Sequence, residues 1–178
     1  MRLVATPLAG VFVVELELLG DERGWFARTY DEALFADHDL EPVGVQANSS
    51  FNAARDTLRG LHFQAAPHGE AKLVRCVRGK IWDVGVDLRP ESDTYLEWHA
   101  VELSADNRRG YYLPAGFAHG FQTLTEDCEV HYVMGHAYVP EAARGVRWDD
   151  PAFAIDWPAP NGDRTISDRD RGYPDFAP

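Results

Sequence analysis

Residues 79–89, GKIWDVGVDLR, alternate between two kinds of side chain. Apolar side chains occupy every second position, at Trp82, Val84, Val86 and Leu88. Asp83 and Asp87 lie between them and would point to the opposite face of an extended chain. A period of two residues predicts a β-strand, and this stretch is the clearest strand of the sequence.

Further strand-like runs surround this stretch, and turn residues separate them. RGYYLPAGFAHGFQTL (109–124) and CEVHYVMGHAYV (128–139) follow it, divided by the polar turn TED (125–127). Several strands at such spacing predict a β-sandwich, jelly roll or barrel. One helix is expected over DEALFADHDL (31–40), with Asp31 as its cap. From RGVRWDDPAFAIDWP (144–158) onward, the sequence predicts an extension that wraps the sheets with short turns.

Composition limits the classes of function. The chain has 178 residues, the size of one domain, and 45% of them are hydrophobic. Its net charge of −12 argues against nucleic-acid binding, so an anionic ligand would need local arginines and lysines. No apolar stretch approaches a membrane span and no targeting signal opens the chain, so we expect a cytoplasmic protein. Cys76 and Cys128 are expected to be buried, unpaired hydrophobes.

The parity of each strand sorts the candidate functional residues. In CEVHYVM (128–134), Tyr132 shares the inward face with Val130, whereas His131 lies beside Glu129 on the outer face, as a surface or interface histidine. His119 shares its face with Phe121, and Lys72 shares its face with Val74.

Each of these residues alone has a structural explanation. His119 would be a hydrogen-bonded core histidine, Tyr132 a packed aromatic, and Lys72 a strand-end residue that reaches water. Together with His62, however, they place titratable groups on the apolar faces of four strands. An apolar interior with such a lining favours shifted pKa values and proton transfer.

Several segments of the chain resemble those of a known protein family. The segments that carry the resemblance are GDERGWF (20–26), LRGLHFQ (58–64), KLVRCVRGKIWDVGVDLR (72–89), LSADNRRGYYLPAGFAHGF (103–121), RGVRWDDPAF (144–153) and ISDRD (166–170). They resemble the dTDP-4-dehydrorhamnose 3,5-epimerase family, often called RmlC-like, of the cupin superfamily. The resemblance runs from about residue 3 to residue 171.

The resemblance implies a fold, an activity and an assembly. Residues 1–178 would form a single RmlC-like cupin domain, a mainly β jelly-roll barrel with a few short helices and a C-terminal extension. Two copies would form a homodimer that exchanges N-terminal strands. The substrate would be a deoxythymidine-diphosphate 4-keto-6-deoxy sugar, inverted at carbons beside the ketone. The family uses no metal and no redox cofactor.

The resemblance also implies roles for individual positions. The matched catalytic positions are His62 as the base, Asp170 as its dyad partner, Lys72, Tyr132 and, as a second active-site histidine, His119. The matched substrate contacts are Arg59 at the diphosphate, Gln46, Asn48 and the aromatic Tyr138. Arg23 and Phe26 match residues that reach the nucleotide from the neighbouring subunit.

The chain departs from the family pattern near the substrate. Arg28, in WFARTY (25–30), stands where members often carry a Glu that helps hold the thymine, which leaves the nucleobase preference open. YVMGH (132–136) replaces a Lys-Thr-Thr-like sequence that follows the catalytic Tyr, which leaves open whether C3, C5 or both are inverted. The family's relatives include 3-only and 5-only epimerases.

Two other functions are compatible with the same fold. A metal-dependent cupin would need a His-x-His pair and a Glu, but Gln64 stands two residues after His62 and Glu70 lies in a turn-like segment. A non-catalytic cupin that binds sugar nucleotides is the second alternative. The presence of His62, Lys72, Tyr132 and Asp170 together argues against it.

The segment TLRGLHFQ (57–64) sets a geometric problem. Arg59 and His62 are three residues apart, so a regular strand would point them to opposite faces. If the resemblance holds, both face one ligand. Gly60 lies between them, and glycine within a strand often marks a bulge that shifts parity by one. We therefore predict a bulge or sharp twist at Arg59–Gly60, with a position for Arg59 at the strand's mouth as the alternative.

Overall fold

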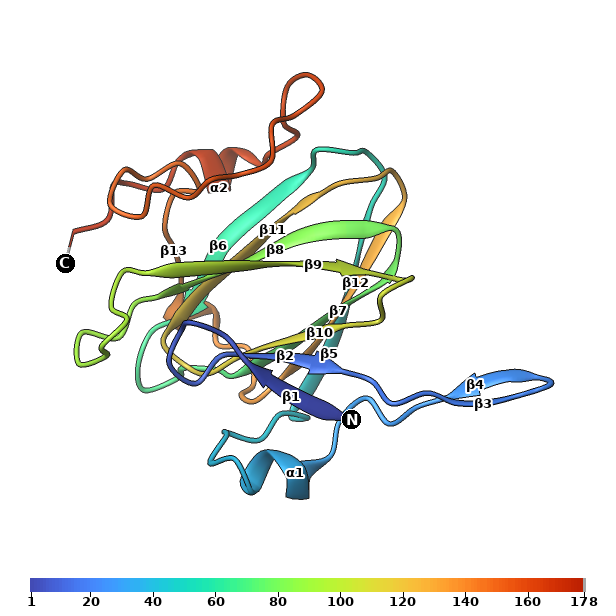
Figure 1. Cartoon of the computed structure of the whole chain (residues 1–178). Helices are drawn as coiled ribbons and strands as arrows, with labels where there is room; N and C mark the ends of the chain where they lie inside the picture. Colours follow the sequence, from blue (N-terminus) through green and yellow to red (C-terminus); the bar gives the residue numbers. More distant parts are fainter. Residues whose placement is uncertain (178) are drawn as a thin grey trace.

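The computed structural model describes residues 1–177, and within them two β-sheets lie face to face (Figure 1). The strands of the first sheet are, in spatial order, β1 (Arg2–Ala5), β2 (Phe12–Glu15), β10 (Gly110–Leu113), β7 (Lys72–Arg78), β12 (Cys128–Met134) and β5 (Gln46–Asn52). Those of the second are β13 (Ala143–Gly145), β6 (Leu58–Gln64), β11 (Phe117–Thr123), β8 (Lys80–Asp87) and β9 (Trp98–Ser104). Neighbouring strands in both sheets are antiparallel. The two sheets form a β-sandwich, which is consistent with the predicted RmlC-like cupin fold, although in residues 1–177 they do not close into the expected barrel.

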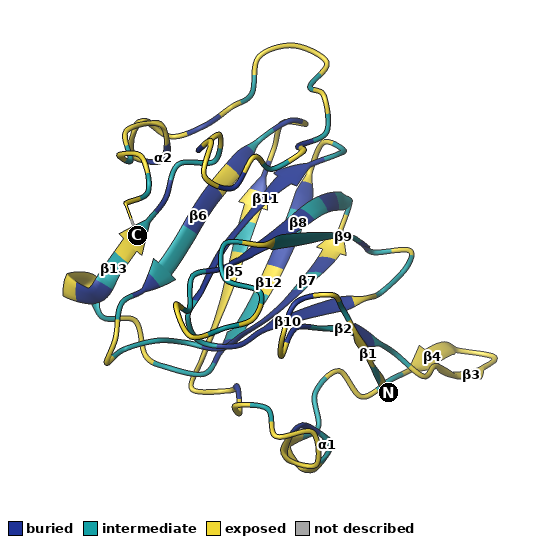
Figure 2. Ribbon diagram, turned by 60° about the vertical axis from the view of Figure 1, so that its left-hand side comes forward, coloured by how far each residue is buried: buried dark blue, intermediate teal, exposed yellow. Residues whose placement is uncertain are grey.

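The core between the sheets is built from the inward faces of their central strands. Its buried members include Val74, Tyr111, Phe121 and Val130. Figure 2 shows that buried residues concentrate on these central strands. The core is large enough to hold the sheets together, since each large apolar side chain that it buries contributes about 1.5–3 kcal/mol.

Both faces of β8 are buried, although its sequence alternates. Val84 and Val86 point to the outer side of the second sheet, and Asp83 and Asp87 are 0% exposed on the inner side. The alternation that predicted the strand therefore does not separate a buried face from a solvent face. It separates an apolar layer from a layer of hydrogen-bonded carboxylates.

The C-terminal extension covers the outer face of the second sheet. Phe153 and Trp157 of this extension pack against Leu58 and Leu61 of β6. Near its C-terminal end the extension contains helix α2 (Asp168–Arg171), which lies beside β6 and carries Asp170. The expected wrapping segment is thus confirmed, and it forms a second apolar core outside the sandwich.

The expected helix at 31–40 is present but shorter. Helix α1 (Glu32–Ala36) begins at the predicted cap, where the Asp31 carboxylate accepts a hydrogen bond from the backbone N–H of Leu34. It ends early because Asp39 adopts a φ of 55° and the N–H of Leu40 turns back to the carbonyl of Phe35. Phe35 anchors the helix on the outer side of the first sheet, 5.2 Å from the ring of Tyr112.

A hairpin of β3 (Leu19–Asp21) and β4 (Gly24–Phe26) projects away from both sheets (Figure 1). Its apolar side chains are exposed, with Phe26 at 70% and Trp25 at 51%. The guanidinium of Arg108 lies 5.1 Å from the centre of the Trp25 ring.

A short 3₁₀ helix, η1 (Pro140–Ala142), precedes β13.

The loop after β8 is held by one buried carboxylate. The Asp87 oxygens accept hydrogen bonds from the Arg89 guanidinium at 2.7 and 2.8 Å and from the hydroxyls of Ser92 and Thr94. Burial opposes ionisation, but these donors outweigh it and lower the pKa of Asp87 to about 2.

Two further expectations concern cysteines and membrane spans. Cys76 and Cys128 are buried and unpaired, as predicted. Among residues 1–177, no helix has the length and apolar character needed to cross a membrane.

Candidate active site

Strand β6 contains the predicted bulge. His62 pairs with His119 and Arg59 pairs with Phe121, so β6 uses one more residue than β11 between the same two pairs. Gly60 has a φ of 116° and its peptide bond to Leu61 is cis. A Cβ at Gly60 would lie 2.6 Å from the Cα of Gly120, so the position admits only glycine. The extra residue changes the parity, and Arg59 and His62 face the same cavity.

This cavity lies between the sheets and has a volume of about 290 Å³. Its walls include six of the residues expected to form the site: Asn48, Arg59, His62, Lys72, His119 and Tyr132. They come from β5, β6, β7, β11 and β12. The parity argument from sequence placed three of them, Lys72, His119 and Tyr132, on inward faces, and the structure has them there.

His62 and Asp170 form a direct pair. His62 Nε2 lies 2.7 Å from Asp170 Oδ1, and the backbone N–H of Gly60 donates to Asp170 Oδ2 at 3.1 Å. Burial opposes the ionisation of Asp170, but these donors hold its pKa below the usual value. An ionised carboxylate only accepts, so we assign the imidazole proton to Nε2. His62 Nδ1 is then the nitrogen that can accept a proton.

Lys72 is the first residue of β7, but its side chain is buried at the inner wall of the cavity and does not extend into water. Its ammonium lies 3.1 Å from Glu70 Oε1 and donates to the carbonyl of His62 at 3.1 Å. Burial lowers the pKa of Lys72, and the negative charge of Glu70 opposes part of that effect. The alternative of a lysine reaching solvent is therefore wrong, because the loop between β6 and β7 folds Glu70 over the ammonium group.

Tyr132 faces the cavity from the sheet opposite His62. Its hydroxyl oxygen lies 3.0 Å from that of Ser50. The Tyr132 and His119 rings meet edge to face, with their centres 6.2 Å apart. Burial raises the pKa of Tyr132, so the phenol stays protonated at neutral pH. His131 points outward as expected, and its side chain is 50% exposed.

A second histidine–carboxylate pair lies deeper in the same cavity. His119 Nε2 is 2.7 Å from Asp83 Oδ1, and both side chains are buried. Burial raises the pKa of Asp83, while His119 and Lys72 counteract the rise. Among the described residues, Asp83 Oδ2 has no hydrogen-bond partner.

Of the expected substrate contacts, only Arg59 and Asn48 line the cavity. Arg59 is exposed and its Nε donates to Asn52 Oδ1 at 2.6 Å, which directs the rest of the guanidinium. Gln46 and Tyr138 do not line the cavity. Gln46 accepts a hydrogen bond from the backbone N–H of Tyr138, and the Tyr138 side chain is exposed.

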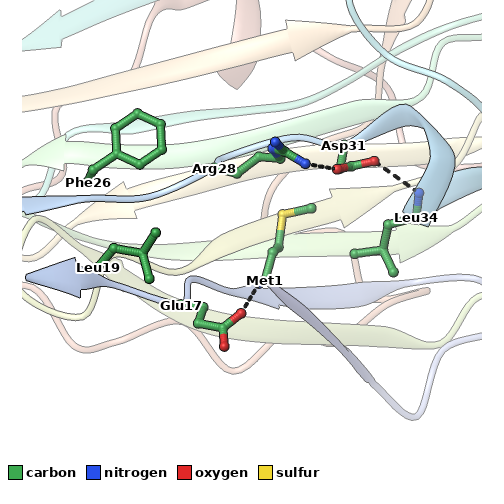
Figure 3. Close-up of a pocket in the computed structure, with 7 residues that line it drawn as sticks. All are labelled: Met1, Glu17, Leu19, Phe26, Arg28, Asp31 and Leu34. Atoms are coloured by element: carbon green, nitrogen blue, oxygen red, sulfur yellow. Dashed lines mark hydrogen bonds and ion pairs between the residues drawn. The ribbon is translucent and has the colours of Figure 1, made fainter.

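Arg23 and Phe26 lie on the projecting hairpin, apart from this cavity. Phe26 lines a separate hollow of about 360 Å³ between the hairpin and α1 (Figure 3). Arg28 lines the same hollow and donates to Asp31, the cap of α1. None of the expected catalytic side chains lies there.

Two acidic residues of the site were not among the expected site residues. Asp83 pairs with His119, and Glu70 pairs with Lys72 and accepts from Gln64. Gln64 also donates to the backbone carbonyls of His68 and Ala137. Within residues 1–177, no three His, Cys, Asp or Glu side chains converge as metal ligands would.

Comparison with known proteins adds an independent line of information. Residues 5–178 match the profile of the family described as dTDP-4-dehydrorhamnose 3,5-epimerase. A dTDP-4-dehydrorhamnose 3,5-epimerase of Methanothermobacter thermautotrophicus is 48% identical over 174 residues, which cover 97% of this chain and 92% of that protein.

Solved structures agree with the sequence comparison. The crystal structure of dTDP-4-dehydrorhamnose 3,5-epimerase from Elizabethkingia anophelis superposes with a TM-score of 0.95 at 40% identity, covering 99% of this chain and 96% of that one. A 3,5-epimerase from Legionella pneumophila, solved in complex with dTDP-4-keto-L-rhamnose, superposes with a TM-score of 0.88 at 33% identity, covering 95% and 89%.

Proposed function

The chain belongs to the dTDP-4-dehydrorhamnose 3,5-epimerase family, and from this premise we propose that it inverts carbons beside the ketone of a dTDP-4-keto-6-deoxy sugar. The enzyme is an isomerase, and the 3,5-epimerase activity of the 48% identical relative favours inversion at both C3 and C5. The observation that carries the proposal is the His62–Asp170 pair, at 2.7 Å, on the wall of a cavity that also holds Lys72 and Tyr132.

The first step is removal of a proton from the carbon beside the ketone. His62 Nδ1 accepts this proton, and Asp170 stabilises the resulting imidazolium through the bond to Nε2. The electron pair of the broken C–H bond moves into the carbonyl group and makes an enolate. Arrangements of this kind typically accelerate proton transfer by about 10²–10⁴-fold.

The enolate oxygen needs positive charge or donors close by. Lys72 supplies an ammonium group that is itself buried, where electrostatic stabilisation is stronger than in solution. His119, held by Asp83, lines the same cavity from the facing sheet. Glu70 keeps the Lys72 ammonium in place between the carboxylate and the carbonyl of His62.

Inversion requires a proton from the face opposite to the base. Tyr132 lies on β12 of the first sheet and His62 on β6 of the second, so the two side chains flank the cavity from opposite sides. We assign the Tyr132 phenol as the acid that protonates the enolate carbon. The phenol recovers its proton from solvent, and His62 releases its proton to solvent. Heavy water should therefore label the inverted carbon.

The nucleotide diphosphate would extend from the cavity toward its mouth. Arg59 is the cation at that position, and an arginine fits phosphate oxygens with two parallel donors. Asn48 would contact the sugar, with Gln46 and Tyr138 further out. These assignments follow the family match, and of the four residues Arg59 and Asn48 line the cavity.

We propose that the working unit is a homodimer with exchanged N-terminal strands. The exposed Trp25 and Phe26 on a hairpin that projects from its own sheets support this assembly, because large exposed apolar side chains usually meet a partner. Arg23 and Phe26 would reach the nucleotide in the partner's cavity.

We also propose a cytoplasmic location. Cys76 and Cys128 are both free, as is usual for proteins in a reducing compartment. Cell fractionation with an antibody against the chain tests this location, and recovery in an extracytoplasmic fraction would contradict it.

The experiment that tests the activity is proton NMR of the protein with dTDP-4-keto-6-deoxyglucose in heavy water. We expect deuterium at C3 and C5 and a product of inverted configuration, and we expect His62→Ala to abolish exchange at both carbons. Labelling at one carbon alone would identify a mono-epimerase. If wild-type protein binds the nucleotide sugar without exchange at any carbon, the chain is a binding module and not an enzyme.

A further inference from the structure

The chain after helix α2 returns to the site and places an aromatic ring beside the base. The Tyr173 and His62 rings lie 6.2 Å apart between centroids, at an interplanar angle of 70°, so one edge faces the other ring. Gly145 of β13 is the ladder partner of His62, and Tyr173 lies directly over it. A Cβ at residue 145 would fall 2.2 Å from Tyr173 Cζ, so the ring occupies the space of the missing side chain.

Contacts on both sides of Tyr173 fix the ring. Its hydroxyl accepts a hydrogen bond from Arg169 Nε at 2.9 Å, one residue before Asp170. Beyond it, Asp175 pairs with Arg147 at 2.6 Å. The hydrogen bond from Arg169 and the Asp175–Arg147 pair therefore hold the ring that faces His62 in place. The Phe176 ring lies further along the chain and packs 5.3 Å from Phe153 in the outer core.

The base needs such a contact because its own restraints are few. Asp170 holds one nitrogen, and the His62 side chain is still 43% exposed. One hydrogen bond fixes the distance to that nitrogen but leaves the imidazole free to tilt about it. An aromatic edge against the ring removes this freedom, and proton abstraction depends strongly on such alignment.

We propose that Tyr173 is a positioning residue that holds the His62 imidazole in the orientation for proton abstraction. Gly145 makes this possible because it has no side chain, and the Tyr173 ring occupies that space; we call this position the seat of the ring. This inference rests on the proposed function of His62 as the base. Tyr173 itself need not touch substrate. Its contribution comes from the ring, and its hydroxyl serves to anchor the ring to Arg169.

The first test compares Tyr173→Ala with Tyr173→Phe. We expect Tyr173→Ala to lower kcat about tenfold with KM changed less than about twofold. An edge-to-face ring pair contributes about enough free energy to change a rate tenfold if the pair stabilises the transition state. Tyr173→Phe keeps the ring and should restore most of kcat. A Tyr173→Phe variant as slow as Tyr173→Ala would overturn the role given to the ring, as would a Tyr173→Ala variant with wild-type kcat.

The second test changes Gly145, the residue over which the Tyr173 ring lies. Gly145→Ala fills the space under the ring and should displace it, giving a loss of kcat similar to that of Tyr173→Ala. In the Tyr173→Ala background, Gly145→Ala should cause no further loss, because the ring is already absent. If the two losses multiply, Gly145 acts on its own and the proposed seat is wrong.

The third test needs no substrate and so separates this inference from the proposed function. Nitrogen-15 NMR of the His62 imidazole in wild-type protein should show one dominant tautomer, with the proton on Nε2, and Tyr173→Ala should populate both. Phe176→Ala is the matched control, since it removes a ring of the same segment that does not touch His62. It should lower Tm but keep the tautomer and kcat. A wild-type tautomer in Tyr173→Ala, or a disturbed one in Phe176→Ala, would refute the proposal even if no substrate is found.

Discussion

At the scale of single residues, each basic group of the site is held by one carboxylate. Asp170 holds His62, Asp83 holds His119 and Glu70 holds Lys72, at distances of 2.7, 2.7 and 3.1 Å. Buried charges are costly without such partners. The pairing therefore explains how an apolar cavity keeps three basic groups, and it also fixes the direction in which each group points.

Tyr132 has no charged partner, and it offers the sharpest test of the division of labour. Tyr132→Phe removes the acid but leaves His62 to take a proton and return it on the same face. We expect deuterium exchange from solvent to fall less than about tenfold, while formation of inverted product falls more than about 100-fold. Both rates come from one NMR time course in heavy water.

Ser50→Ala is the control for this variant. It removes the hydroxyl that contacts Tyr132, at 3.0 Å, but keeps the acid, so inversion should persist. Equal loss of exchange and inversion in Tyr132→Phe would contradict the assignment of separate acid and base.

The sequence was informative for the basic members of these pairs and less so for the acidic ones. His62, Lys72, His119 and Tyr132 stood out because strand parity put polar groups on apolar faces. Asp83 did not, because an aspartate on the polar side of an alternating strand resembles a solvated residue. Glu70 lies in a loop, and its contact with Lys72 depends on how that loop folds back.

At the scale of elements, the bulge in β6 determines what the strand can do. One extra residue, Gly60, brings the side chains of Arg59 and His62 to a single cavity. In a regular strand, residues three apart would point to opposite faces. The presence of a bulge was predictable from a glycine between two polar residues. The contact of Gly60 with Gly120 on the neighbouring strand was not, because it depends on tertiary packing.

Gly60→Ala should therefore damage both stability and activity. The new Cβ would meet the Gly120 Cα at 2.6 Å and the His119 carbonyl oxygen at 2.7 Å, in a backbone conformation that alanine avoids. We expect a loss of more than about 2 kcal/mol in the free energy of unfolding, measured by urea denaturation.

Gly162→Ala is the matched control, since a Cβ there meets nothing within 4 Å. It should change the free energy of unfolding by less than about 0.5 kcal/mol. A Gly60→Ala protein as stable as Gly162→Ala would show that β6 relaxes around the side chain.

The loop after β8 makes a prediction about pH. The pKa of Asp87 is about 2 in the folded chain and about 3.9 when unfolded, so the folded state favours the ionised form. The resulting stabilisation, roughly 2 kcal/mol, is complete above about pH 4 and is lost as the pH falls toward 2.

Asp87→Asn isolates this contribution. The difference in free energy of unfolding between wild type and variant should be about 2 kcal/mol at pH 7 and about half of that at pH 3. A difference that does not depend on pH would mean that Asp87 acts through packing alone.

At the scale of the whole molecule, the hairpin that bears Arg23 and Phe26 projects away from both sheets (Figure 1), and neither residue lines the cavity of its own chain. Together with the proposed homodimer, this arrangement makes a prediction for mixed subunits. His62→Ala and Arg23→Ala proteins should each be impaired alone, because each lacks one half of every site.

After the two proteins are unfolded and refolded together, half of the dimers should be mixed. Each mixed dimer then contains one site with both residues intact, so activity should recover to about a quarter of wild type. Refolding each protein alone is the control. Without recovery in the mixture, Arg23 would serve the cavity of its own chain.

The position of Asp170 has a consequence for how the enzyme is made. The strands of the sandwich end at β13, but the partner of the catalytic histidine arrives only with α2, near the end of the chain. During synthesis, where folding proceeds from the N-terminus, the sheets can assemble while this helix has not yet left the ribosome. The His62–Asp170 pair therefore forms only after the sheets, and a chain that stops before residue 170 would keep every strand of both sheets but be inert.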